Sequence, residues 1–215
     1  MFRKGIMKLI FPQSKVHPSY KSYLAWSSLS NFSASVQQAI VTETMIQTIS
    51  SQHESVRTLS YIGKDVIGQV GGALFMSRIG TMVDSPHTKY KYLNNILLYH
   101  QLGIFGIISS EIFPEQFIYV AGASNILLNL SFVGSGAVNA KCIRELSLSQ
   151  DNIGDIYSKI SLCNTISSTL GLLVGMGINV GLNLYLDNLF LKFGSCGLFG
   201  LLRVYSYKKS VQDIY

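Results

Sequence analysis

Three long stretches of the chain contain no charged residue, and they set its hydrophobic pattern. These stretches are residues 22–42, 116–140 and 160–186. The second holds 25 residues and the third 27, whereas a helix needs about 20 mainly apolar residues to cross a bilayer. We therefore predict that the second and third stretches are membrane-spanning helices. Asparagines inside the third stretch would need partners in hydrocarbon, so one side of that helix is expected to pack on protein.

The first uncharged stretch lies inside a longer periodic segment, residues 19–51. Apolar side chains such as Tyr20, Tyr23 and Leu24 return there at steps of three and four residues, which is typical of an amphipathic helix. Frequent serines dilute its hydrophobicity. We therefore expect this helix to lie against a membrane or a partner rather than to cross the bilayer.

Proline and short polar segments divide the middle of the chain into further helices. We predict helices over residues 55–83 and 89–110, with Pro86 between them. A polar turn at residues 113–115 would pair the second of these with the following uncharged helix as an antiparallel hairpin.

Together these elements predict an all-α fold: a multi-helix membrane-associated bundle of five to seven helices, two or three of them spanning. Residues 141–159 are expected to form the main hydrophilic loop, and residues 189–205 are too short and glycine-rich to predict a span. We divide the chain into a basic extended lead-in (residues 1–18), a helical domain (residues 19–205) and a polar tail (residues 206–215).

Small residues recur at close intervals in two of the predicted helices. Residues four positions apart lie on the same edge of a helix, and glycines there let another backbone approach closely. Without such packing, a glycine inside a helix costs about 1 kcal/mol relative to alanine. We therefore predict helix-packing edges at six glycines: Gly68, Gly72, Gly171, Gly175, Gly177 and Gly181.

The chain is poor in charge, with 13% charged residues against about 25% in globular proteins. Because so few charged residues cannot solvate a full surface, much of the exterior is expected to face membrane lipid or other protein subunits.

The net charge of +6 is concentrated at the amino end, before the first acid, Glu43. That pattern is typical of an organelle-targeting leader, a juxtamembrane basic patch or a plain solvated end. We expect an organellar membrane, specifically the mitochondrial inner membrane, and no nucleic-acid partner, because no basic stripe follows a helix face.

Motifs for catalysis, metal binding and cofactor binding are missing from the sequence. The histidines are scattered, and there is no HExxH, P-loop, GxGxxG or GxSxG pattern. We expect no enzyme activity, no catalytic residue, no metal and no cofactor. His100 is expected to be a core histidine that is hydrogen-bonded to a neighbour. Cys142, Cys163 and Cys196 lack CxxC spacing and are expected to be single buried thiols.

Four ionisable residues are candidate buried polar groups. Lys64 and Asp65 lie between apolar stretches, and if their helix is buried they need partners and become functional candidates. We favour the alternative, in which both charges reach water at a helix end. Asp155 and Lys159 form an i,i+4 acid–base pair at the start of the third uncharged helix, where a capping and surface role is the simpler interpretation.

Several groups of residues follow one another in an order that is known from one family. They are Phe11, Pro12, Tyr20, Tyr23 and Trp26; Lys64, Asp65, Gly68, Gly71 and Gly72; Gly80, Asp84, Lys89 and Tyr90; Phe113, Pro114, Asn125 and residues 133–137; and Asn152, Asp155, Ser158, Lys159 and residues 170–173. In this collinear order the chain resembles the root UVB sensitive family, also called the DUF647 family, in a diverged and shortened form.

The resemblance implies an association with membranes of plastids, mitochondria or related compartments. In plants, it also implies links to seedling development, auxin transport and vitamin B6 homeostasis. Arginines that the family carries near Gly72 and at Asn139 are absent here, and the sequence after Lys159 departs from the family pattern. No reaction and no cofactor come with the resemblance.

These observations predict a non-enzymatic accessory or scaffold subunit of a larger mitochondrial membrane protein complex. The alternative is a small-molecule carrier or permeation protein, linked to vitamin B6 or other metabolite homeostasis, in which the four ionisable residues line a polar path. A third hypothesis is a soluble helical module that binds a phosphorylated cofactor such as a B6 vitamer. Carriers often contain an internal repeat, and its absence here favours the accessory role.

Overall fold

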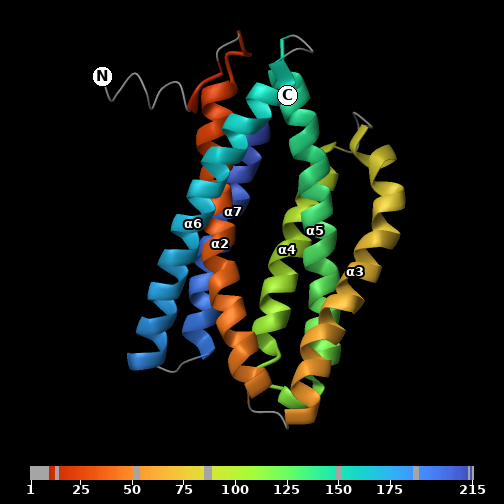
Figure 1. Ribbon diagram of the computed structural model, residues 1–215, viewed down its shortest axis with the longest axis vertical. Helices are drawn as coiled ribbons and strands as arrows, with labels where there is room; N and C mark the ends of the chain where they lie inside the picture. Colours follow the sequence, from red (N-terminus) through yellow and green to blue (C-terminus); the bar gives the residue numbers. More distant parts are fainter. Residues whose placement is uncertain are drawn as a thin grey trace.

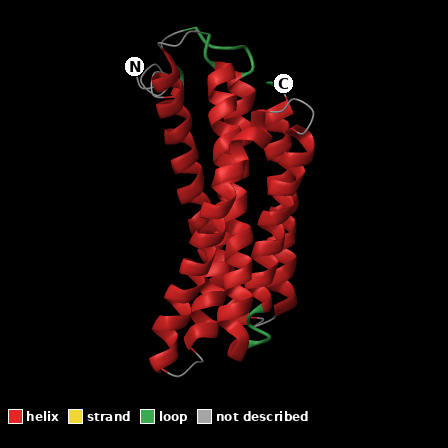
Figure 2. Cartoon of the chain, turned by 90° about the vertical axis from the view of Figure 1, so that its right-hand side faces the viewer, coloured by secondary structure: helices red, strands yellow, loops and turns green. Residues whose placement is uncertain are grey.

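The computed structural model describes residues 10–12, 15–50, 54–84, 89–148, 152–185, 189–212 and 214. Long α-helices run side by side along one axis through this part of the chain (Figures 1 and 2), which confirms the predicted all-α fold. The elements are α2 (Tyr20–Ser50), α3 (Glu54–Asp84), α4 (Lys89–Ser109), the short 3-10 helix η1 (Pro114–Gln116), α5 (Phe117–Leu146), α6 (Ile153–Tyr185) and α7 (Leu189–Gln212).

The six long helices form two layers of three. In one layer α2 packs on both α6 and α7, and in the other α5 lies between α3 and α4 (Figure 1). The layers are joined along α4, which packs on both α7 and α2. By contrast, α5 makes few contacts with α2 and α6. The two layers therefore meet along one side and separate along the other.

The helix α2 is the central helix of its layer, which differs from the surface position that its serines and threonines predicted. It buries residues along nearly its whole length, from Tyr20 to Ile49. Its hydroxyls bond within the helix: Ser33 Oγ donates to the Leu29 carbonyl oxygen at 2.9 Å. Because such hydroxyls are satisfied by the preceding turn, they can be buried without an outside partner. The serines and threonines therefore do not make a polar surface.

Two apolar clusters fill the bundle, one in each half of its length. The first surrounds Tyr23 and Ile96, and the second surrounds Ile40 and Ile104. On α4 the two clusters are separated by residues 98–103, which include the buried His100. The polar side chains at the middle of the bundle therefore lie between the two apolar clusters.

Three helices are longer than the sequence predicted. α5 continues to Leu146 and α6 begins at Ile153, so most of the expected hydrophilic loop is helical. Lysine, arginine, glutamate and leucine are good helix formers, which explains why charge did not end α5. Similarly, α7 continues to Gln212 and includes most of the expected polar tail.

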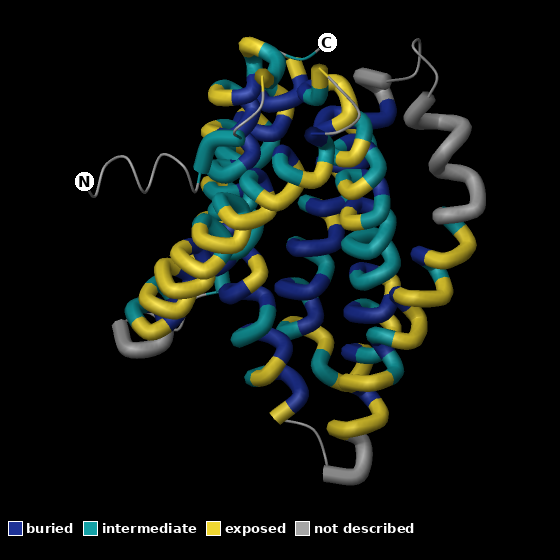
Figure 3. Tube along the Cα trace, turned by 45° about the horizontal axis from the view of Figure 1, so that its top comes forward, coloured by how far each residue is buried: buried dark blue, intermediate teal, exposed yellow. Residues whose placement is uncertain are grey.

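In the part of the chain that the structure describes, three helices are long and apolar enough to cross a membrane: Pro114–Leu146, Ile153–Leu182 and Leu189–Gln212. This agrees in length and composition with the predicted two or three spanning helices. Leu189–Gln212 is long enough to be a candidate because α7 extends past the apolar run of residues 189–205. Many residues of α6 are exposed (Figure 3), including the large apolar side chains Ile166, Leu170 and Leu173.

Candidate functional site

A polar cavity opens where the two layers separate. It has a volume of about 650 Å³ and receives side chains from α2, α3, α4, α5 and α7. Many of the lining residues carry amides, hydroxyls or charged groups, including Asn31, Gln38, Asn125, Asn129 and Ser135. A membrane-spanning helix seldom carries such side chains unless they face a protein interior or a water-filled cavity.

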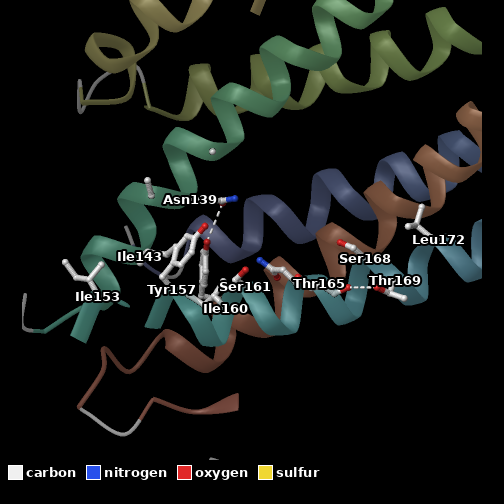
Figure 4. A pocket seen from close by; sticks show the side chains of 14 residues that line it. Asn139, Ile143, Ile153, Tyr157, Ile160, Ser161, Thr165, Ser168, Thr169 and Leu172 are labelled. Carbon is white, nitrogen blue, oxygen red and sulfur yellow. Dashed lines mark hydrogen bonds between the residues drawn. The ribbon is translucent and has the colours of Figure 1, made fainter. Parts of the chain in front are cut away.

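A second cavity, of about 590 Å³, continues along the bundle between α5 and α6 (Figure 4). Its walls combine isoleucines with a row of hydroxyls on α6 that includes Ser161, Thr165 and Ser168. Gly136 and Asn139 of α5 line both cavities. We therefore treat the two cavities as one feature, the interlayer groove, with Gly136 and Asn139 at the junction.

Hydrogen bonds hold Asn139 at this junction. The hydroxyl of Tyr23 on α2 and the hydroxyl of Tyr207 on α7 both donate to Asn139 Oδ1, at 3.4 Å and 3.2 Å. Tyr207 also lies 3.2 Å from the Ser135 carbonyl oxygen, which is an alternative acceptor for its proton. One amide on α5 is thus connected to two helices of the opposite layer.

Two buried nitrogen atoms in the first cavity lack a hydrogen-bond partner in the described part of the chain. They are Nε2 of His100 on α4 and Nη1 of Arg203 on α7. His100 is buried, as expected for a core histidine, but this nitrogen does not bond to a neighbour. Burial, together with the positive charge of Arg203, holds the pKa of His100 well below its ordinary value. The imidazole is therefore neutral at physiological pH.

Lys64 and Asp65 form part of the α3 wall of the same cavity. Lys64 is buried, at 5% exposure, and its ammonium pairs with the Asp65 carboxylate, whose side chain is 43% exposed. Asn125 Nδ2 on α5 donates to Asp65 Oδ1 at 3.1 Å and to the Lys64 carbonyl oxygen at 3.0 Å. The Lys64 ammonium also lies 4.5 Å from the centre of the Tyr61 ring. Lys64 is therefore a buried, partnered charge rather than one that reaches water freely.

Asp155 and Lys159 lie apart from the groove. Their charged groups are 4.0 Å apart in the first turns of α6, and neither residue lines the two cavities. The structure therefore brings together Lys64 and Asp65 but not all four ionisable candidates.

Four of the six candidate glycines face a neighbouring helix, and the other two do not. Gly171 and Gly175 face α2, where a Cβ added at Gly175 would lie 2.8 Å from the Val36 carbonyl oxygen. Gly68 and Gly72 face Asn125 and Asn129 of α5. The remaining two, Gly177 and Gly181, have open space on the side where a Cβ would project, as far as the described residues extend.

The sequence did not single out Arg203 or Asn139 as site residues, although one signal was present for Arg203. It is the only charged residue between Lys192 and Lys208, inside an otherwise apolar run. Within the described residues, no group of three or more His, Cys, Asp or Glu side chains could hold a metal ion. None of the three cysteines forms a disulfide.

The fold and the groove define a class: an all-α bundle with a polar interlayer groove and helices that are long enough to cross a membrane. Residues 2–214 match the family described as the vitamin B6 photo-protection and homoeostasis domain. The chain belongs to this family, as the order of its motifs indicated.

Named relatives agree with this assignment. The chain is 26% identical over 170 residues to protein root UVB sensitive 3 of Arabidopsis thaliana, a match that covers 77% of this chain and 38% of the relative. It is 23% identical over 177 residues to root UVB sensitive 4 of the same plant, covering 80% and 34%. It is 25% identical over 178 residues to RUS family member 1 of Dictyostelium discoideum, covering 80% and 33%. The chain thus spans about a third of the length of these relatives. No solved structure matches it.

Proposed function

We propose that this protein is a non-enzymatic membrane protein that binds a small polar solute in the interlayer groove and carries it, or lets it pass, across the bilayer. The polar groove inside a bundle with an apolar exterior is the observation that carries the proposal. Polar side chains in a membrane bundle are costly unless they face a cavity or one another, and there they commonly mark solute pathways. Lys64 and Asp65 contribute to this path, whereas Asp155 and Lys159 do not.

The family description indicates the metabolic process to which the solute belongs. We infer that the solute is connected with vitamin B6 or other metabolite homeostasis, since that is the process in the family's name. The basic, acid-free amino end supports an organellar location, and we propose the mitochondrial inner membrane. Fractionation of organelles, followed by carbonate extraction of the membranes, tests this location. Release of the protein by carbonate would contradict membrane insertion.

A single glycine allows the groove to be filled without disturbing the packing. A Cβ added at Gly136, at the junction of the two cavities, meets nothing within 4 Å among the described residues. We therefore expect Gly136→Leu to fold normally and to obstruct the groove. Gly154→Leu is the matched control, because Gly154 has equally open surroundings and does not line the groove.

The test is the identity of small molecules that co-purify with the protein. Each variant is extracted in mild detergent, purified and denatured, and the released molecules are analysed by mass spectrometry. We expect one polar metabolite to be enriched in the unmodified protein and in Gly154→Leu and to be lost from Gly136→Leu. Equal amounts in all three samples, or none in any, would contradict solute binding in the groove.

A different surface favours a second candidate function, that of an accessory or scaffold subunit. On α6 the open edge at Gly177 is bordered by the exposed apolar side chains Met176 and Val180. Such a surface suits either lipid or another subunit. If a subunit covers it, Gly177→Leu should reduce the apparent mass of the assembly on a blue native gel, while Gly154→Leu should not. Unchanged migration of a protein near its own mass would contradict this role.

A further inference from the structure

The interlayer groove carries a net positive charge. Among the described residues, three formally charged side chains line its two cavities: Lys64, Asp65 and Arg203. Lys64 and Asp65 pair with each other and neutralise their charges. Arg203, on the other hand, has no carboxylate within ion-pair distance among the described residues. The guanidinium is therefore the uncompensated charge of the groove.

The surroundings of Arg203 provide further hydrogen-bonding groups without partners. Arg203, His100 and Ser135 line the same cavity, and Nη1, Nε2 and the hydroxyl oxygen of these residues, respectively, are each buried and unsatisfied in the described part of the chain. They come from α7, α4 and α5. A buried donor without a partner destabilises the folded protein, and an unpaired charge destabilises it more as it becomes buried. Three such groups around one cavity indicate a ligand that satisfies them.

We propose that Arg203, His100 and Ser135 form a binding site for an oxyanion group, either a phosphate or a carboxylate, of the molecule that occupies the groove. A guanidinium presents a planar fork of N–H donors that matches such a group with two parallel hydrogen bonds. Neutral His100 donates from Nε2 when its proton is on that nitrogen, and the Ser135 hydroxyl supplies another donor. The bound anion neutralises the charge of Arg203 and accepts hydrogen bonds from all three residues. This inference rests on the proposed solute-binding function and specifies the chemical class of the solute.

The anionic group can belong to a free solute or to a lipid headgroup, because the groove is open on one side. Purified protein in a phosphate-free sugar detergent is melted with inorganic phosphate or with sodium chloride at equal ionic strength and neutral pH. A ligand that binds only the folded state raises the melting temperature. For a chain of this size, we expect a rise of about 3–6 °C at a saturating concentration.

The variant Arg203→Gln should lose this rise, and Ser135→Ala should reduce it. Lys208→Gln, which changes an exposed lysine one turn further along α7, is the control and should keep it. Arg203→Gln is expected to fold, because it removes a charge that has no counter-charge in the described part of the chain and whose Nη1 is buried. Its melting temperature without phosphate should equal or exceed that of the unmodified protein. If Arg203→Gln does not fold, Ser135→Ala and His100→Gln provide the same comparison.

Dihexanoyl phosphatidic acid, titrated in parallel, distinguishes the two sources of the anion. If phosphatidic acid raises the melting temperature at a concentration at least tenfold lower than inorganic phosphate requires, the result would support a lipid headgroup. If it requires a similar or higher concentration, the result would support a free anion. No rise with either probe, or a rise that Arg203→Gln retains, would overturn the anion site. If Gly136→Leu still loses a co-purified solute in that case, solute binding stands without the anion site. If the phosphate response depends on Arg203 but no solute co-purifies, the anion site stands and the proposed function fails.

Discussion

Lys192 on α7 and Glu111, just after α4, form an ion pair in which one ammonium donates to both carboxylate oxygens, at 2.9 and 3.0 Å. Gln47 Oε1 on α2 accepts a further hydrogen bond from the same ammonium at 2.9 Å. The Lys192 side chain is only 2% exposed, whereas that of Glu111 is 29% exposed. This contact connects α2 and α7 to the hairpin between α4 and α5.

The unequal exposure of this pair predicts unequal effects of substitution. Glu111→Gln leaves a buried ammonium without its counter-charge and should lower the free energy of unfolding by about 3 kcal/mol. Lys192→Met should remain within about 1 kcal/mol of the unmodified protein, because Glu111 can turn toward water and the thioether side chain fills the buried volume. Equilibrium unfolding in detergent micelles measures both values. The double variant serves as the control and should resemble Lys192→Met, while a larger cost for Lys192→Met than for Glu111→Gln would contradict this account.

The two kinds of glycine on α6 predict stability changes of opposite sign. At Gly171 an added Cβ would clash with the Phe32 carbonyl oxygen of α2, so Gly171→Ala should destabilise the protein by about 1–3 kcal/mol. At Gly177 the space is open, so Gly177→Ala should stabilise it by about 0.5–1 kcal/mol through helix propensity alone. Thermal unfolding of both variants under one condition provides the comparison. Changes of the same sign would show that α6 does not pack on α2 along this edge.

The three cysteines predict a simple chemical test of the bundle. Cys142 and Cys196 are fully buried, whereas Cys163 is partly exposed beside Phe11 and Lys21 in a shallow surface pocket. We expect N-ethylmaleimide to modify one thiol in the folded protein and all three after denaturation in SDS, as counted by mass spectrometry. Cys163→Ser should abolish the rapid modification. Rapid reaction at Cys142 in the folded protein would contradict the packing of α5.

Much of the architecture could be predicted because it depends on local features. The uncharged runs of α5 and α6, the break at Pro114, and the order of the family motifs are all readable from residues close together in the chain, whereas Pro86 lies outside the described residues. Helix periodicity also places Gly171 and Gly175 on one edge. The position of α2 was less accessible, since its serines have the same composition whether they face water or bond to their own helix.

The groove could not be predicted in this way. His100 and Arg203 come from helices about a hundred positions apart, and neither residue belongs to a motif. Periodicity states which residues share one face of a helix, but it does not state which helices become neighbours. The same limit explains why Lys64 and Asp65 line the groove while Asp155 and Lys159, equally plausible in sequence, do not.

The all-α class, the approximate helices and the family thus follow from the order of amino acids, because length, apolar runs and motif order are local properties of the chain. The packing of the helices, by contrast, places α2 in the interior, separates the two layers on one side, and leaves Arg203 without a counter-charge among the described residues. The physical reason is that burial and charge compensation depend on neighbours in space. Those neighbours are set by the packing of whole helices rather than by the residues on either side in the chain.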